Sequence, residues 1–288
     1  MHRTLSALLG IAFLAPAAPV ADAQNARQAR QQVEASMLVT GHVDIDRTGR
    51  VTAHVLDQPD KLPPYVVDLV ERALPALRFE PILVDGAPVL ARAKMSIRLV
   101  AKPTGDGDGT MQLRIASAHF GEEYSDSDRT SVRRSNLRPP RYPMNIAQIG
   151  GKGSVYLLVQ VGGDGRPVDV VAEQVNLTAV GSAREMEMIR ATLAKTAVDN
   201  ARKHWVFTPP DAGEDAGRDY WVVRVPVDFR LDDSGETAYG KWSAYHPGPV
   251  QRPVWAAPVP LGFSPDTLVA GGMTPESSRF KLLTPLEG

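Results

Sequence analysis

The feature that most constrains the fold is a run of alternating apolar residues in the middle of the chain, between Gly153 and Val161. Side chains of a β-strand alternate between its two faces, so the run places one apolar set on one face: Val155, Leu157, Val159 and Val161. Asp164 and Gly165 follow, and glycine readily adopts the positive φ of a tight turn. Because Val168 and Val170 then resume the alternation, the sequence predicts a β-hairpin with one buried face.

A helix and one more strand are predicted after this hairpin. Ser182 and Glu185 have the spacing of a capping box, and apolar residues then recur at helical intervals: Met186, Ile189, Leu193, Ala197 and Ala201. Further on, a second alternating set comprises Trp221, Val223, Val225, Val227, Phe229 and Leu231. Strict alternation is typical of a strand with one face on a core. The predicted order is therefore ββαβ.

The motifs of this stretch resemble those of the C-terminal domain of TonB. The resemblance lies in the order and spacing of Tyr142, Pro143, Gly153, Asp164, Gly165, Phe207 and Pro209. It covers residues 139–233. It implies a periplasmic domain that contacts outer-membrane receptors by strand pairing with a short peptide segment.

The N-terminal half follows the same plan. Gly41, Gly49, Phe79 and Leu99 match Gly153, Gly165, Phe207 and Leu231 in order. Pro63 and Pro64 open a predicted helix between them, since proline is well placed in a first helical turn. The first copy lacks the Tyr-Pro lead-in. We interpret residues 36–120 as a diverged TonB-like module and expect Phe79 and Phe207 to occupy equivalent core positions.

The predicted fold class is α+β, with two ββαβ modules that are each a small antiparallel sheet with one helix on a face. The expected parts are a signal peptide (1–23), the two modules (36–120 and 139–233), a polar linker between them (121–138) and a Pro-rich tail (246–288). The tail holds eight prolines in 43 residues, far above the average of about 5%. We expect it to be extended, to form no packed strand, and to be pinned by Trp255, Phe263 and Phe280.

The first residues have the pattern of an export signal. His2 and Arg3 precede an apolar core from Leu5 to Leu14, and small residues surround Ala23, where cleavage is expected. The apolar run is shorter than the roughly 20 residues of a membrane span. We expect a periplasmic protein; the alternative is an uncleaved anchor in the inner membrane with the rest of the chain facing the periplasm.

Composition and motifs argue against several functions. The net charge of −1 gives no field that favours nucleic acid, and with zero cysteines there is no thiolate metal site or catalytic thiol. No Gly-x-Ser-x-Gly elbow is present, and Gly150 to Ser154 lacks the Lys-Ser/Thr pair of a phosphate loop. We therefore predict no catalytic residue, no metal, no cofactor and no enzymatic activity.

What remains is a sheet edge. Proline is tolerated in sheets mainly on edge strands, so Pro226 predicts that the strand from Trp221 to Leu231 is an edge. Unpaired backbone groups on an edge accept an incoming strand. The candidate partner-binding residues are Trp221, Val223, Val225, Val227 and Phe229. A proline at Val223 or Val225 is expected to abolish binding, with one of the two facing the open side.

The expected partners are envelope proteins, among them TonB-dependent outer-membrane receptors, and the sequence does not fix the oligomeric state. The alternative function is energy transduction from the inner membrane, with the N-terminal segment kept as an anchor. We also expect the two modules to pack as a pair with both helices toward a shared interior, since such small units bury little core alone.

Overall fold

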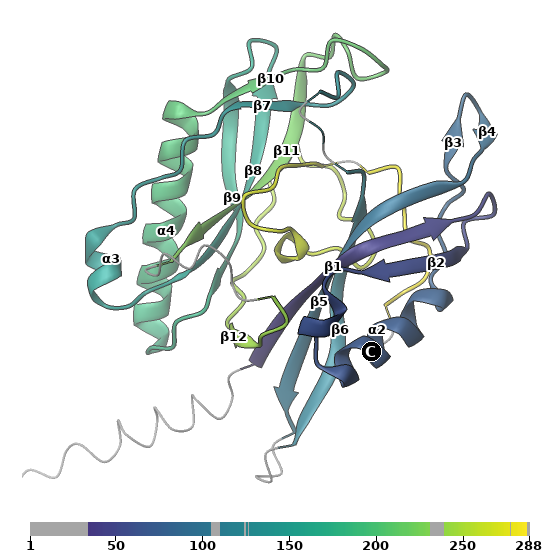
Figure 1. Cartoon of the computed structure of the whole chain (residues 1–288). Helices are drawn as coiled ribbons and strands as arrows, with labels where there is room; N and C mark the ends of the chain where they lie inside the picture. The colour runs from purple at the N-terminus through teal and green to yellow at the C-terminus, as the bar shows by residue number, and fades with distance from the viewer. Residues whose placement is uncertain are drawn as a thin grey trace, which may run out of the picture.

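The computed structural model describes residues 34–104, 110–123, 125, 127–230, 239–276 and 278–286. The predicted signal peptide lies outside the described residues. Two antiparallel sheets form two lobes, each with a helix on its outer face, and the C-terminal segment (residues 239–286) runs between and around them (Figure 1). The α+β class predicted from the sequence is confirmed.

The first sheet belongs mainly to the N-terminal half. In spatial order its strands are β12 (Ser243–Tyr245), β1 (Glu34–Ile45), β5 (Ala91–Pro103) and β6 (Met111–Gly121), and β2 (Val51–Leu56) also pairs with β1. Helix α2 (Pro64–Ala73) packs Val66 and Val70 into the core of this sheet. Short elements complete the lobe: η1 (Pro59–Lys61), η2 (Leu74–Ala76), β3 (Leu83–Val84) and β4 (Ala87–Pro88).

The second sheet contains the predicted hairpin of residues 153–170. Its strands, in spatial order, are β13 (Thr274–Pro275), β11 (Tyr220–Phe229), β8 (Gly153–Gly162) and β9 (Pro167–Leu177). Helix α4 (Ala183–His204) covers one face and begins at the predicted capping box of Ser182 and Glu185. The second lobe also contains a short ribbon of β7 (Arg133–Asn136) and β10 (Val206–Thr208), and the helix α3 (Met144–Gln148). The turn η3 (Pro265–Thr267) belongs to the C-terminal segment.

Each lobe contains the same close backbone contact between a hairpin turn and a phenylalanine. The amide of Phe79 donates to the carbonyl of Gly49 at 2.8 Å, and the amide of Phe207 donates to the carbonyl of Gly165 at the same distance. Both glycines have positive φ, and a Cβ on either would lie within 2.2 Å of the phenylalanine carbonyl oxygen. Each hairpin turn therefore packs closely against the backbone of a buried phenylalanine. Only glycine, which has no Cβ, fits at this point of the turn.

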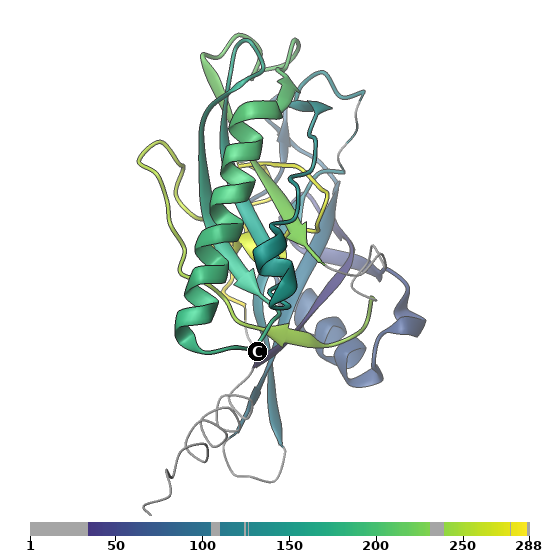
Figure 2. The same ribbon diagram turned by 90° about the vertical axis from the view of Figure 1, so that its left-hand side faces the viewer.

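The helices do not pack toward a shared interior, so that expectation is wrong. Helices α2 and α4 lie on the outer faces, and the two sheets face each other across the C-terminal segment (Figures 1 and 2). The reason is the chemistry of the inner faces. Ser96, Arg98, Glu173, Asn176 and Arg224 lie there and need polar partners, which the C-terminal segment supplies and an apolar helix face does not.

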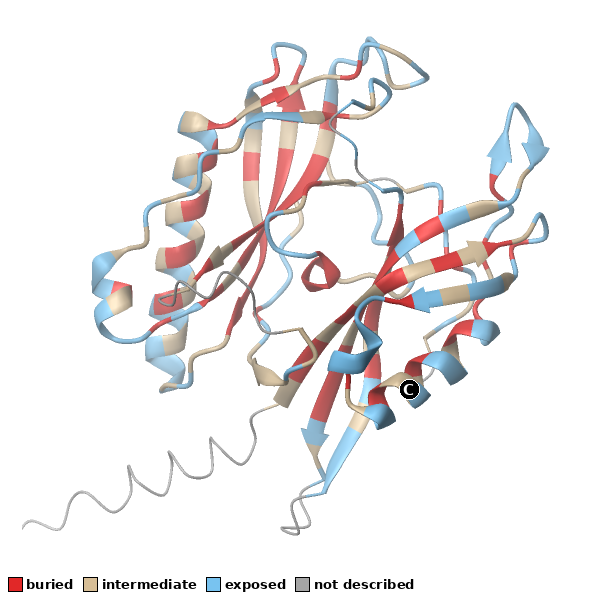
Figure 3. Cartoon of the chain, in the orientation of Figure 1, coloured by how far each residue is buried: buried red, intermediate tan, exposed pale blue. Residues whose placement is uncertain are grey.

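The Pro-rich tail is more regular than expected. Residues 265–267 form a buried turn between the sheets (Figure 3), and Thr274 and Pro275 form the strand β13, so the expectation that no strand packs there is wrong. Pro275 has no amide hydrogen to donate, and β13 tolerates it because the hydrogen bond to β11 comes from the next residue. The amide of Glu276 donates to the carbonyl of Val222 at 2.9 Å. Phe280 is buried in the core of the first lobe.

Candidate partner-binding edge

The five residues predicted to bind a partner all point into one core. The side chains of Trp221, Val223, Val225, Val227 and Phe229 are buried in the core of the second lobe. Leu231, the last residue of the predicted strand, lies outside the described residues. A partner added to this strand would therefore meet its backbone rather than these side chains.

The backbone of β11 has one paired side and one outer side. All ten residues pair with β8, without a register shift, from Tyr220 opposite Gly162 to Phe229 opposite Gly153. The carbonyl of Val222 accepts from Glu276 on the other side. Because both backbone groups of a residue in an antiparallel strand point the same way and the direction alternates, the even-numbered residues of β11 point outward.

This alternation corrects the expectation about Val223 and Val225. Residues two apart share a direction, so both point toward β8 and neither faces the open side. A proline at either position would break the ladder within the sheet. Pro226, by contrast, points outward, which explains how the strand accommodates a proline without losing a bond to β8.

The outer side of β11 is only partly covered. Strand β13 pairs with Val223 and Arg224 alone. Toward the end of the strand, the backbone groups of Pro226 and Asp228 make no outward hydrogen bond to any residue that the structure describes. Toward its C-terminal end, β11 is thus an edge strand of the sheet. Where β13 pairs with it, β11 is the second strand from the edge.

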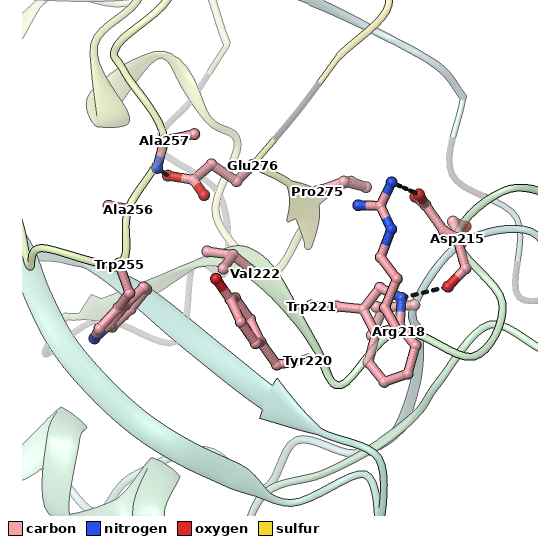
Figure 4. Close-up of a pocket in the computed structure, with 12 residues that line it drawn as sticks. Asp215, Arg218, Tyr220, Trp221, Val222, Trp255, Ala256, Ala257, Pro275 and Glu276 are labelled. Carbon is pink, nitrogen blue, oxygen red and sulfur yellow. Dashed lines mark hydrogen bonds and ion pairs between the residues drawn. The ribbon is translucent and has the colours of Figure 1, made fainter.

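A small pocket lies beside the start of β11 (Figure 4). It has a volume of about 270 Å³ and is lined among others by Tyr220, Val222, Trp255, Pro275 and Glu276. This is below the range of about 300 to 1,000 Å³ typical of small-molecule sites.

The rim of the pocket is held by polar contacts. The indole of Trp221 donates to the carbonyl of Asp215 at 2.9 Å, and the side chain of Asp215 pairs with Arg218 at 2.6 Å. The indole of Trp255 donates to Asp169 at 3.0 Å. These bonds fix the walls, while Tyr220 remains 43% exposed at the mouth.

A buried ion network fastens the C-terminal segment beside this pocket. Arg224, which is 2% exposed, donates to both oxygens of Glu173 at 2.7 and 3.2 Å, and Arg252 also bonds Glu173. Arg252 reaches Glu276 at 3.1 Å, and the amide of Ala257 donates to the same carboxylate. Burial raises the pKa of Glu276, and the two arginines oppose that rise. Two arginines and two glutamates thus balance in charge, as buried ions require.

The sequence analysis did not identify this network. Its local signal is weak: Glu173 is one of several polar residues of β9, with Asp169 and Gln174, and Arg224 alternates with apolar residues as a solvent-facing residue would. The partners Arg252 and Glu276 lie far away in the Pro-rich tail. Only the paired sheets bring the four together.

The remaining family-motif residues shape the backbone. The hydroxyl of Tyr142 donates to the carbonyl of Gly151, and burial raises the pKa of this phenol. Pro143 precedes α3. The side chain of Asp164 accepts from the amide of Arg166 at 3.0 Å and stabilises the turn. Pro209 lies beside that turn, 3.6 Å from where a Cβ on Gly165 would sit, and a Cβ on Gly153 would lie 2.2 Å from the carbonyl of Asn176.

The described ranges contain neither a metal-binding cluster nor a helix suited to crossing a membrane. No group of three or more His, Cys, Asp or Glu side chains there is arranged to hold a metal ion. None of the helices described has the length and apolarity needed to cross a membrane.

The fold and the edge define a two-sheet α+β protein in which an edge strand is partly covered by the chain's own C-terminal segment. Over 103 residues, 35% of its length, the chain is 34% identical to two proteins called "Protein TonB" from two strains of Xanthomonas campestris pv. campestris. The match spans 39% of the length of these relatives. No family model matches the chain, and no solved structure does. The similarity supports a distant relationship to TonB.

Proposed function

We propose that this chain is a non-enzymatic periplasmic protein that binds envelope proteins of outer-membrane transport by strand addition to the outer edge of β11. The observation that carries the proposal is the outward-facing backbone of Pro226 and Asp228: it makes no hydrogen bond to a described residue, although Pro226 itself is buried. The exposed side chain of Tyr220 at the start of the strand supports it, because strand addition combines backbone pairing with contacts to alternate side chains. The similarity to TonB supports the choice of partner class.

We further propose that residues 36–120 and 139–233 are two TonB-like modules, the first a diverged copy. The matching contacts of Phe79 with Gly49 and of Phe207 with Gly165 support this. So does the crowding at the first glycine of each hairpin: a Cβ on Gly41 would lie 2.2 Å from the carbonyl of Val55, as one on Gly153 would from that of Asn176. Only the second module carries the candidate edge.

An energy transducer is the second candidate, favoured by the name of the two relatives. The two functions differ at the N-terminus, since a periplasmic protein requires cleavage after Ala23 and a transducer requires a retained anchor. Intact-mass measurement of the protein recovered from cells distinguishes them. A chain that begins at Gln24 supports the periplasmic protein, and a retained Met1 in the membrane fraction supports the transducer.

The binding proposal is tested by photocross-linking from Tyr220, replaced with benzoylphenylalanine, to outer-membrane receptors in intact cells. Asp228→Pro removes an outward amide and the side chain together, while Asp228→Ala removes the side chain alone, including its 2.5 Å bond from Ser154. We expect Asp228→Pro to lose the receptor cross-links and Asp228→Ala to keep them. Equal cross-linking by both variants would contradict strand addition at this edge.

A further inference from the structure

The C-terminal segment occupies backbone groups at the edges of both sheets. The carbonyl of Gly262 accepts from Ala118 of β6, the amide of Gln251 donates to Glu173 of β9, and the amide of Glu276 donates to Val222 of β11. Exposed strand edges invite pairing with other chains, and proteins commonly cover them. One segment of this chain thus covers part of these three strands and, through β12, part of β1.

The contact with β11 is short and includes a proline. Strand β13 has two residues, pairs with Val223 and Arg224 only, and one of its two residues is Pro275, which has no amide to donate. Short pairings with few backbone hydrogen bonds open locally at low free energy. The two backbone pairings of β13 therefore cost little to open, and the main resistance to release comes from Met273 and Glu276, which are buried beside them.

The chain on both sides of β13 is anchored independently. Upstream, Asp266 is 1% exposed and accepts from Asn176 at 3.0 Å and from Tyr245 at 2.5 Å. Downstream, Phe280 and Leu282 are buried in the core of the first lobe. Gly271 and Gly272 precede β13 and give the backbone freedom there. Release of β13 therefore leaves both anchors in place.

We propose that residues Thr274 to Glu276 are a competitor in cis for the β11 edge and must leave before a partner strand can pair along it. The segment already lies antiparallel to β11, as an added strand would. The proposal rests on the proposed function in that β11 is the partner site, and it adds that access to the site is regulated by the chain itself.

The ion network stabilises the covered state, in which β13 pairs with β11. With Glu276 in place, two arginines face two glutamates; without it, Arg224 and Arg252 share Glu173 alone, which leaves one net positive charge in a buried setting. That imbalance favours the covered state. An incoming strand has to compensate for it with its own contacts.

A labelled synthetic peptide with the sequence of residues 272–278 serves as the probe, because it can pair with β11 only when the cis strand has left. Glu276→Pro removes both the amide that donates to Val222 and the carboxylate that takes part in the ion network. Val254→Pro is the matched control: it also follows a proline, its side chain is fully exposed, and its amide donates to no described residue. Fluorescence anisotropy measures binding, and thermal unfolding checks that both variants fold.

We expect Glu276→Pro to bind the peptide at least tenfold more tightly than the wild type, and Val254→Pro to bind like the wild type. Binding by Glu276→Pro that is no tighter than that of the wild type would overturn the proposal. So would equal gains in the two variants, since the effect would then come from loosening the segment in general.

The opposite variant locks the strand. Val223 and Pro275 are directly opposed, and the bonds around them indicate a non-hydrogen-bonded pair, which brings their Cα atoms to about 4.5 Å, within disulfide range. The chain has no native cysteine, so Val223→Cys with Pro275→Cys forms a defined bridge. The oxidised form should fail to bind the peptide and dithiothreitol should restore binding; equal binding by both forms would contradict displacement. A chain that behaves as expected with the peptide yet cross-links to no receptor keeps this inference and overturns the proposed function.

Discussion

At the scale of single residues, the turn glycines carry the clearest constraint. Gly165 has a φ of 77°, and a Cβ there would lie 2.2 Å from the carbonyl oxygen of Phe207. Gly163, in the same turn, has no atom within 4 Å of its Cβ position and no positive φ. Two neighbouring glycines thus differ in whether a side chain fits.

Gly165→Ala should therefore destabilise the protein by at least about 2 kcal/mol, since a left-handed conformation alone costs a residue with a Cβ about 1 to 2 kcal/mol and the clash adds to it. Gly163→Ala should change the free energy of unfolding by less than about 0.5 kcal/mol. Urea unfolding of the two variants measures the difference. Equal midpoints would show that the turn does not close on Phe207 as described.

His119 predicts a dependence of stability on pH. Burial, with a contribution from Arg224, lowers the pKa of this imidazole from 6.5 to about 4, and its ring packs against Phe263 with centroids 5.7 Å apart. The folded state therefore binds fewer protons than the unfolded state between these two values. Stability is full above about pH 6.5 and falls as the pH drops toward 4, by up to about 3 kcal/mol.

Thermal unfolding between pH 7 and pH 4 measures this loss, and His119→Gln, which does not titrate, should show a shallower fall. Burial also lowers the pKa of His246, so part of the slope remains in the variant. Identical slopes for the variant and the wild type would exclude His119 as a source.

At the scale of elements, Phe207 tests how the helix connects to the edge strand. It is buried in the core of the second lobe, and its ring lies edge-on to Trp205 with centroids 6.2 Å apart. Phe207→Ala should cost about 3 to 5 kcal/mol through lost burial and the cavity that remains. Denaturant unfolding gives the value. A midpoint equal to that of the wild type would mean that Phe207 is not a core residue of this module.

Elements with strong local periodicity were predictable from the sequence. The alternation from Gly153 predicts β8, which spans Gly153–Gly162, and the capping box places the start of α4 at the observed residue. The direction of the β11 backbone was also available, because alternation has a period of two, yet Val223 and Val225 were expected to face opposite ways. Residues two apart in a strand face the same way, so both point toward β8.

The contacts of the C-terminal segment could not be predicted in the same way. Glu276 pairs with Val222 and Arg252 with Glu173, and both pairs join residues far apart in the sequence. Proline content predicts a lack of regular structure, but it carries no information on which edge an extended segment meets. Such contacts depend on tertiary packing, which no local pattern encodes.

At the scale of the whole molecule, the C-terminal segment joins the two lobes. Asp266 bonds Asn176 of the second sheet, and its carbonyl accepts from Arg98 of the first. Ser96 of the first sheet donates to the carbonyl of Thr267 at 2.5 Å. Since both inner faces carry polar groups, their stability depends on these partners rather than on apolar contact alone.

Asp266→Ala should therefore destabilise the protein by about 3 kcal/mol, because it leaves the buried partners Asn176 and Tyr245 with an unmade bond each. Asp60→Ala, at an exposed position, is the control and should be nearly neutral. Calorimetry of the two variants compares them. A small effect of Asp266→Ala would mean that the segment does not hold the lobes together.

The most direct test of the central claim is hydrogen exchange of the β11 amides, measured by nuclear magnetic resonance with and without the periplasmic segment of a TonB-dependent receptor. Strand addition predicts that the outward amide of Asp228 gains protection when the segment binds, while the amides of Val225 and Val227, which point toward β8, keep the protection that they already have. Binding that protects other surfaces and leaves the amide of Asp228 exchanging as before would contradict the claim that this edge receives the partner.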